Sequence, residues 1–197
     1  ENPKNFNPAF PGPAFDRTHG VSSEEPQVVE TGDYARIRWT SEVPGLAAVH
    51  TLTLFRELDD IDLAVHIAKP ERFGPESVFV AFPFAVGRPE FLVETAGAVF
   101  AAETEQLPDT SKDWYSIQHA VGVRGDGGAV LWGTVDAPLV QLGGIRTGEW
   151  SRTLDPVGGH IDSWVMNNLH FTNFQARQEF TGTLHYRFRP ATAEGLR

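Results

Sequence analysis

The chain has 197 residues, of which 41% are hydrophobic and 21% charged, a composition typical of one soluble globular domain with a sizeable core. Its formal charge of −10 argues against binding to nucleic acid or to an anionic membrane, because both require a basic surface. The absence of cysteine excludes disulfides, thiolate catalysis and cysteine-based zinc sites. No run of about 18 apolar residues occurs, so no membrane-spanning helix is predicted.

The first 25 residues differ from the rest of the chain. They carry Pro3, Pro8, Pro11 and Pro13 and show no periodicity, so residues 1–25 are predicted to form an extended arm or linker. Residues 26–197 are predicted to form one β-sandwich domain. The chain starts at Glu1 instead of Met and shows no signal peptide, so we expect a fragment or a processed form.

Apolar and polar residues alternate along several segments, which predicts half-buried strands. The first such strand covers residues 34–40, and the pattern returns at Leu52 and Leu54. Residues 61–67 alternate in the same way, and the polar residues 57–60 before them predict an antiparallel hairpin.

Further along the chain, residues 77–86 are apolar on both faces, which predicts a strand covered on both sides. Pro83 within it marks an edge, a bulge or a bend. The run Gly125–Gly128 predicts a hairpin between strands at 116–123 and 129–134, and a closing strand is expected at 183–189. Only residues 87–107 and the stretch near Asn167 leave room for a short helix. The predicted class is all-β, an antiparallel β-sandwich.

Three polar-aromatic segments, at 106–119, 136–145 and 162–174, are candidates for a functional site. Indole faces stack on sugar rings, while Asp, Asn, Gln and His side chains orient sugar hydroxyls. The alternative is that the tryptophans are core aromatics and the asparagines satisfy turn backbones. The candidate residues for sugar or interdomain contact are Asp113, Trp114, Gln118, His119, Asp162, Trp164, Asn167, Asn168, His170 and Asn173.

Glycoside hydrolysis and metal binding are two further kinds of chemistry that these segments could support. Glycosidases use two carboxylates across the scissile bond, and the candidates are Asp113, Asp136, Glu149 and Asp162, each of which is also a common turn or cap residue. His160 and Asp162 share a strand face, as metal ligands sometimes do. No second histidine pair and no His-Glu-x-x-His helix accompany them, so no metal site and no catalytic residue is predicted in this chain.

Several blocks of the chain resemble the C-terminal region of bacterial proteins related to glycoside hydrolase family 38, the α-mannosidases. The resemblance is collinear from about Thr51 to Pro190 and rests on five blocks: Val80-Ala81-Phe82-Pro83-Phe84-Ala85, Asp113-Trp114-Tyr115, Asp136-Ala137-Pro138-Leu139-Val140-Gln141-Leu142-Gly143-Gly144, Ser163-Trp164-Val165-Met166-Asn167-Asn168 and Tyr186-Arg187-Phe188-Arg189-Pro190.

This resemblance implies a galactose-mutarotase-like β-supersandwich, of which the chain would be a part. It also implies a zinc ion and an aspartate nucleophile in an N-terminal catalytic domain that nothing in this chain matches. His160-Ile161-Asp162 has the letters of a zinc motif but lies in the β region, so no cofactor is expected in this chain.

The resemblance predicts a non-catalytic C-terminal domain of an α-mannosidase-like hydrolase, with the catalytic domain of the same protein as its partner and carbohydrate as a further ligand. The bacterial cytoplasm is the favoured compartment. The alternative is a stand-alone mutarotase-like sugar epimerase, in which His119 or His170 would act with Glu149 or Asp162, or a carbohydrate-binding module.

Overall fold

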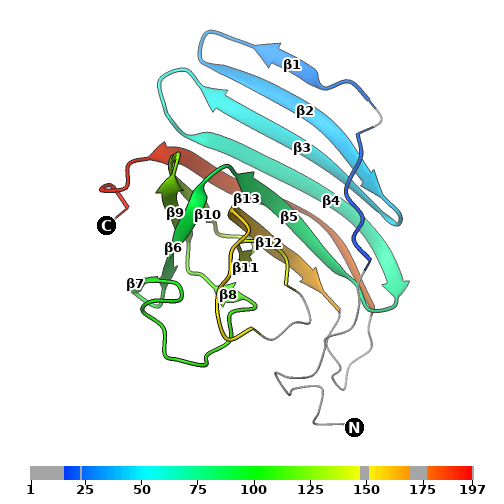
Figure 1. Cartoon of the computed structure of the whole chain (residues 1–197). Coiled ribbons are helices and arrows are strands. Elements are labelled where there is room, and N and C mark those ends of the chain that lie inside the picture. The colour runs from blue at the N-terminus through cyan, green and yellow to red at the C-terminus, as the bar shows by residue number, and fades with distance from the viewer. Residues whose placement is uncertain (1–15, 23, 147–150, 169–176, 197) are drawn as a thin grey trace.

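The computed structural model describes residues 16–22, 24–146, 151–168 and 177–196 (Figure 1). Within these ranges it contains thirteen strands and no helix, so none of the described segments is a helix long and apolar enough to cross a membrane. All strand pairs are antiparallel, which confirms the all-β, antiparallel class.

Nine of the strands form the larger of two sheets. In spatial order they are β1 (Gln27–Glu30), β2 (Tyr34–Val43), β3 (Leu46–Phe55), β4 (Ile61–Phe73), β13 (Arg177–Ala191), β10 (Gly128–Thr134), β9 (Ala120–Asp126), β6 (Gly87–Thr95) and β7 (Ala98–Ala101). The smaller sheet has the order β5 (Ser77–Phe84), β12 (Gly159–Asn167), β11 (Leu139–Leu142) and β8 (Tyr115–Ser116).

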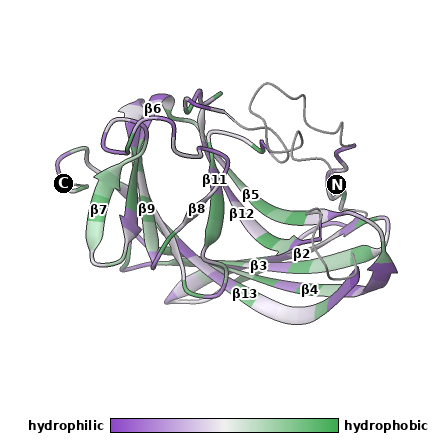
Figure 2. Cartoon of the chain, turned by 90° about the horizontal axis from the view of Figure 1, so that it is seen from below, coloured by the Kyte–Doolittle hydropathy of each residue, from purple (hydrophilic) through white to green (hydrophobic). Residues whose placement is uncertain are grey.

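The two sheets pack face to face around one core. In Figure 2, β5, β12 and β11 lie above β3, β4 and β13 of the larger sheet. Trp132 and Tyr186 from the larger sheet meet Phe82 and Ile161 from the smaller one, and all four are buried. This arrangement is the predicted sandwich, since each sheet buries the apolar face of its alternating strands against the other.

Most predicted strands are confirmed. The alternation at residues 34–40 corresponds to β2, and the segments around Leu52 and residues 61–67 form the predicted hairpin as β3 and β4. Gly127, with φ of +94°, turns the chain between β9 and β10, as predicted from the run Gly125–Gly128. Pro83 lies in β5, which is an edge strand, the position that proline tolerates.

Three expectations are wrong in part. Residues 87–107 form β6 and β7, because Phe91 and Val93 are buried in a two-residue alternation and not in a helical one. Near Asn167, strand β12 continues to that residue. The strand predicted at residues 77–86 is not covered on both sides, because Ala81 and Pro83 of β5 are exposed.

The strand predicted at 116–123 is divided between the two sheets. Its first position, Ser116, belongs to β8 of the smaller sheet, and the chain then crosses to β9 of the larger one. At the crossing, the Ile117 amide donates to the Pro138 carbonyl, while the Gln118 amide donates to the Glu94 carbonyl. The predicted polar segment at 106–119 therefore contributes to two different surfaces.

Of the predicted N-terminal arm, residues 1–15 and 23 lie outside the described residues. Residues 16–22 contain no strand of their own, and Val21 forms an isolated antiparallel bridge with Glu42 at the end of β2. The first strand of the sandwich begins at Gln27.

Candidate functional site

Four of the five sequence blocks on which the resemblance was based lie side by side in the smaller sheet. The block at Val80–Phe84 is in β5, the one at Ser163–Asn167 in β12, the one at Leu139–Leu142 in β11, and Tyr115 opens β8. Register pairs β12 with both β5 and β11, and β11 with β8. Segments spread over about half of the chain are thus assembled into one surface.

Aromatic rings cluster on the face of this sheet that points away from the core. The Trp164 ring stacks on Phe79 with ring centroids 5.3 Å apart, and the Trp114 ring meets it edge-on at 5.9 Å. The Trp164 indole N–H donates to the Ser77 hydroxyl at 3.0 Å. Trp164 is buried, whereas Trp114 keeps 38% of its surface exposed, so Trp114 is the ring that a partner or ligand can reach.

Asp162 and Gln141 form a buried polar pair on the same sheet. They are direct cross-strand partners, with 3% and 0% of their surface exposed. The Gln141 Oε1 atom accepts a hydrogen bond from the Arg146 amide, while Gln141 Nε2 and Asp162 Oδ2 have no hydrogen-bond partner among the described residues. Burial raises the pKa of Asp162 to about 6, an effect that His160 and Arg17 oppose.

Two of the predicted asparagines, Asn167 and Asn168, lie at the end of this sheet, and one of them serves the backbone. The Asn168 side chain donates to the Gly74 carbonyl, and its amide donates to the Glu76 carbonyl. Asn167 Oδ1 accepts from the Ser77 hydroxyl at 3.3 Å. The alternative interpretation, in which the asparagines satisfy turn backbones, therefore describes Asn168, which is also buried.

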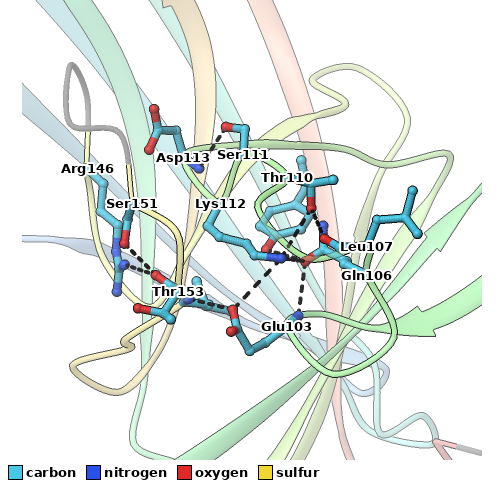
Figure 3. Close-up of polar contacts among 12 residues, drawn as sticks. Glu103, Gln106, Leu107, Thr110, Ser111, Lys112, Asp113, Arg146, Ser151 and Thr153 are labelled. Atoms are coloured by element: carbon cyan, nitrogen blue, oxygen red, sulfur yellow. Dashed lines mark hydrogen bonds and ion pairs between the residues drawn. The ribbon is translucent and has the colours of Figure 1, made fainter. Parts of the chain in front are cut away.

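Next to Asp113, a buried lysine ties two loops together (Figure 3). Lys112 Nζ donates to Gln106 Oε1 at 3.0 Å and to the Thr110 hydroxyl at 3.3 Å, and lies 3.9 Å from a Glu103 oxygen. The same Glu103 oxygen accepts from the Leu154 amide. This network links residues 103–112 to the loop after β11, and it positions the segment that carries Asp113 and Trp114.

The structure divides the ten predicted site residues. Six of them belong to the smaller sheet and its loops: Asp113, Trp114, Asp162, Trp164, Asn167 and Asn168. Gln118 and His119 lie just before β9 of the larger sheet, where His119 Nδ1 is 3.1 Å from Glu94 Oε1. His170 and Asn173 lie outside the described residues, as does Glu149.

The carboxylate and metal candidates do not assemble as a site in the described part of the chain. Asp136 accepts hydrogen bonds from His185 at the larger sheet, while Asp162 lies within the smaller one. His160 does approach Asp162 on one strand face, as predicted from their spacing. Among the described residues, no three metal-ligating side chains gather where they could hold an ion.

A groove on the other face of the molecule was not predicted. It has a volume of about 820 Å³ and lies on the outer face of the larger sheet, across β3, β4, β13, β10 and β9. Its lining includes His119 and His185, each of which contacts a carboxylate, Glu94 and Asp136 respectively. The alternation in residues 183–189 indicated that one face of this strand is polar. Which other strands lie beside that face and line the groove depends on strand register, which the sequence does not show.

No model of a known protein family matches the chain. No curated protein matches it either. Among solved structures, the chain is similar to the galactose mutarotase related enzyme from Lactobacillus acidophilus, with 9% sequence identity, a TM-score of 0.41, and coverage of 86% of this chain and 72% of that one.

It is also similar to a protein from Escherichia coli K12 whose assignment as an aldose 1-epimerase is provisional, with 12% identity, a TM-score of 0.43, and coverage of 86% and 69%. Neither is described as an α-mannosidase. At these identities and scores, nothing about function follows for this chain.

Proposed function

We propose that this β-sandwich is a non-catalytic accessory domain of an α-mannosidase-like glycoside hydrolase, which supports the catalytic domain and contacts carbohydrate or that domain. The observation that carries the proposal is the convergence of four family-like blocks, far apart in the chain, on the four-stranded sheet. The outer face of that sheet is where the aromatic pair Trp114 and Trp164 lies.

The chemistry of this face supports contact and not catalysis. Trp114 offers a half-exposed ring of the kind that stacks on sugars or fills a partner's pocket. Asp162 is buried beside Gln141, and the charged groups that act on it among the described residues are His160 and Arg17, whereas a glycosidase pair requires a second carboxylate. Zinc, if the parent enzyme uses it, is expected in its catalytic domain.

The experiment uses the parent protein and the 197-residue chain side by side. The chain alone is expected to leave an aryl α-mannoside intact, whereas the parent hydrolyses it. Trp114→Ala in the parent should lower kcat/KM about tenfold without changing the thermal midpoint, because an exposed ring contributes to contact and little to folding. Leu107→Ala, which removes another exposed apolar side chain, is the matched control and should change neither. Unchanged kinetics in Trp114→Ala would remove the contact role.

A second candidate is a stand-alone mutarotase-like epimerase, favoured by the two histidine–carboxylate pairs at the groove. Sugar epimerisation needs a general acid and a general base within one cleft, and His119 with Glu94 and His185 with Asp136 supply these groups. The expected pairing of His119 with Asp162 is not found, since the two residues lie in different sheets. Polarimetry of fresh α-glucose and α-galactose decides: acceleration above buffer that His185→Gln abolishes supports this candidate, and a rate equal to buffer excludes it.

A further inference from the structure

The groove on the outer face of the nine-stranded sheet has no part in the proposed accessory role. Its volume of about 820 Å³ falls within the range of small-molecule sites, which is roughly 300–1,000 Å³. It adjoins a smaller hollow of about 260 Å³, with which it shares Thr51 and Ala64.

Strand register arranges the lining in two parallel rows that cross the strands. In the first row, Arg36 pairs with Thr53, Thr53 with Asp62, and Asp62 with Arg187. The second row consists of Arg38, Thr51, Ala64 and His185 in the same strand order. Since direct partners in a sheet point to the same side, each row presents its side chains to the groove.

The charge of this surface is opposite to that of the molecule. The lining holds three guanidinium groups, Arg36, Arg187 and Arg189, against two carboxylates, Asp60 and Asp62, and Arg38 adds a fourth cation in the adjoining hollow. The whole chain has a formal charge of −10. An excess of cations in a groove of an acidic protein raises the local concentration of anionic ligands.

Two of these cations are available to a ligand. Arg187 is held by Asp62 through two hydrogen bonds of 2.6 and 2.8 Å. Arg36 donates to the Thr53 hydroxyl at 3.4 Å and lies over the Tyr34 ring. In the described part of the chain, neither Arg36 nor Arg38 has a carboxylate partner. They stand two residues apart on one face of β2, about 6.6 Å at the usual rise of a strand.

Groups that bind hydroxyls lie directly beside this cationic edge. Thr51 and Thr53 follow on β3, and the Asp62 carboxylate, oriented by Arg187, follows on β4. Guanidinium groups bind carboxylate or phosphate, whereas threonine hydroxyls and carboxylates bind alcohols. A ligand that satisfies both halves carries an anionic group at one end and hydroxyl groups along the rest.

We propose that the groove binds an acidic saccharide, with its carboxylate or phosphate between Arg36 and Arg38 and its hydroxyls toward Thr51, Thr53 and Asp62. This inference does not depend on the accessory role or on epimerase activity, because it concerns a different face from the former and binding without turnover. The failure of either of those proposals leaves it testable.

Calorimetric titration of the 197-residue chain with four probes tests the ligand class: D-glucuronic acid, glucose 6-phosphate, D-glucose and inorganic phosphate. One of the two acidic sugars should bind at least about tenfold more tightly than glucose, because a hydrogen bond to a charged group contributes more than a neutral one. The tighter of the two identifies the anion as carboxylate or phosphate. Affinity should fall between 50 and 300 mM NaCl.

Two substitutions place the site. Arg38→Gln and Arg36→Gln should each weaken binding of the preferred acidic sugar about tenfold, while binding of glucose stays the same. Arg152→Gln is the matched control, since Arg152 is an exposed cation on a loop outside the groove lining. A thermal midpoint within a few degrees of the parent value for all three variants confirms that folding is intact.

Four results would each overturn the proposal. They are equal affinity for glucose and both acidic sugars, equal affinity for inorganic phosphate and the acidic sugars, no heat with any probe at millimolar concentration, and binding by both groove variants that matches Arg152→Gln. The second of these would show an anion site without saccharide recognition.

Discussion

At the scale of single residues, Asp162 is a carboxylate that is almost completely removed from water. It is almost fully buried, and within the part of the chain that the structure describes its Oδ2 atom has no hydrogen-bond partner. Burial disfavours the charged form and raises the pKa from 3.8 to about 6, in spite of the opposing effects of His160 and Arg17. A buried carboxylate of this kind lowers the stability of the folded state at neutral pH.

The pH dependence of stability tests this description. The folded chain binds the Asp162 proton more tightly than the unfolded chain, so the stability that this group contributes is full below about pH 4 and is lost as the pH rises through about 6. A shift of about 2 units corresponds to about 3 kcal/mol. Asp162→Asn resembles the protonated form, so its stability relative to the parent should rise by up to about 3 kcal/mol between pH 4 and pH 7 in urea unfolding.

Asp126 provides the control for that measurement. Its exposed carboxylate accepts two hydrogen bonds from Arg88, and this ion pair lowers its pKa. The stability that this ion pair contributes is present above the ordinary pKa of 3.8 and is lost as the pH falls through the lowered folded value. The stability of Asp126→Asn relative to the parent should therefore change little between pH 4 and pH 7, where that of Asp162→Asn rises. A stability difference for Asp162→Asn that is the same at pH 4 and pH 7 would contradict the buried-carboxylate description.

At the scale of elements, the hairpin of β9 and β10 shows which roles of glycine can be predicted from the sequence and which cannot. The glycine run Gly125–Gly128 predicted a turn, and Gly127 and Gly128 do have positive φ angles. Gly125 has a different role. A Cβ atom there would lie 2.3 Å from the Gly87 carbonyl oxygen and 2.8 Å from that of Arg88, so the residue allows β6 to approach β9. No local pattern could distinguish this contact from a turn requirement.

Gly125→Ala is accordingly expected to destabilise the fold by about 2–3 kcal/mol in urea unfolding, since the new methyl group meets backbone atoms that cannot rotate away. Gly32→Ala is the matched control, because a Cβ atom at Gly32 meets nothing within 4 Å and its change should stay within about 0.5 kcal/mol. Equal effects of the two substitutions would show that β6 does not approach β9 as closely as described.

The same limit explains which parts of the fold and site were predictable. Alternation identified β2, β4 and β13, since period-two burial depends only on neighbouring positions. The crossing at Gln118 was missed, because it depends on which strands the Ile117 and Gln118 amides meet. The groove was missed for the same reason: Arg36 and His185 come together through register over four strands.

At the scale of the whole molecule, a cluster of aromatic rings spans the contact between the two sheets. Phe82 of the smaller sheet lies with its ring centroid 5.2 Å from Trp132, 4.9 Å from Tyr186 and 5.9 Å from Phe188, all three in the larger sheet. Offset and edge-on ring pairs at such distances add to the free energy of burial. One side chain thus joins the sheet that carries the recognised blocks to the sheet that carries the groove.

Phe82→Ala should therefore destabilise the whole sandwich by about 3–5 kcal/mol, because it removes a buried ring and leaves a cavity between the sheets. Phe73→Ala, at a ring that is 73% exposed, is the matched control and should cost less than about 1 kcal/mol. Unfolding in urea followed by tryptophan fluorescence and by far-ultraviolet circular dichroism should give coincident transitions in both variants, since Trp164 reports on the smaller sheet and Trp132 on the larger. Two separate transitions in Phe82→Ala would show instead that the two sheets unfold independently. The packing of Phe82 would then not couple the stability of the smaller sheet to that of the sheet that carries the groove.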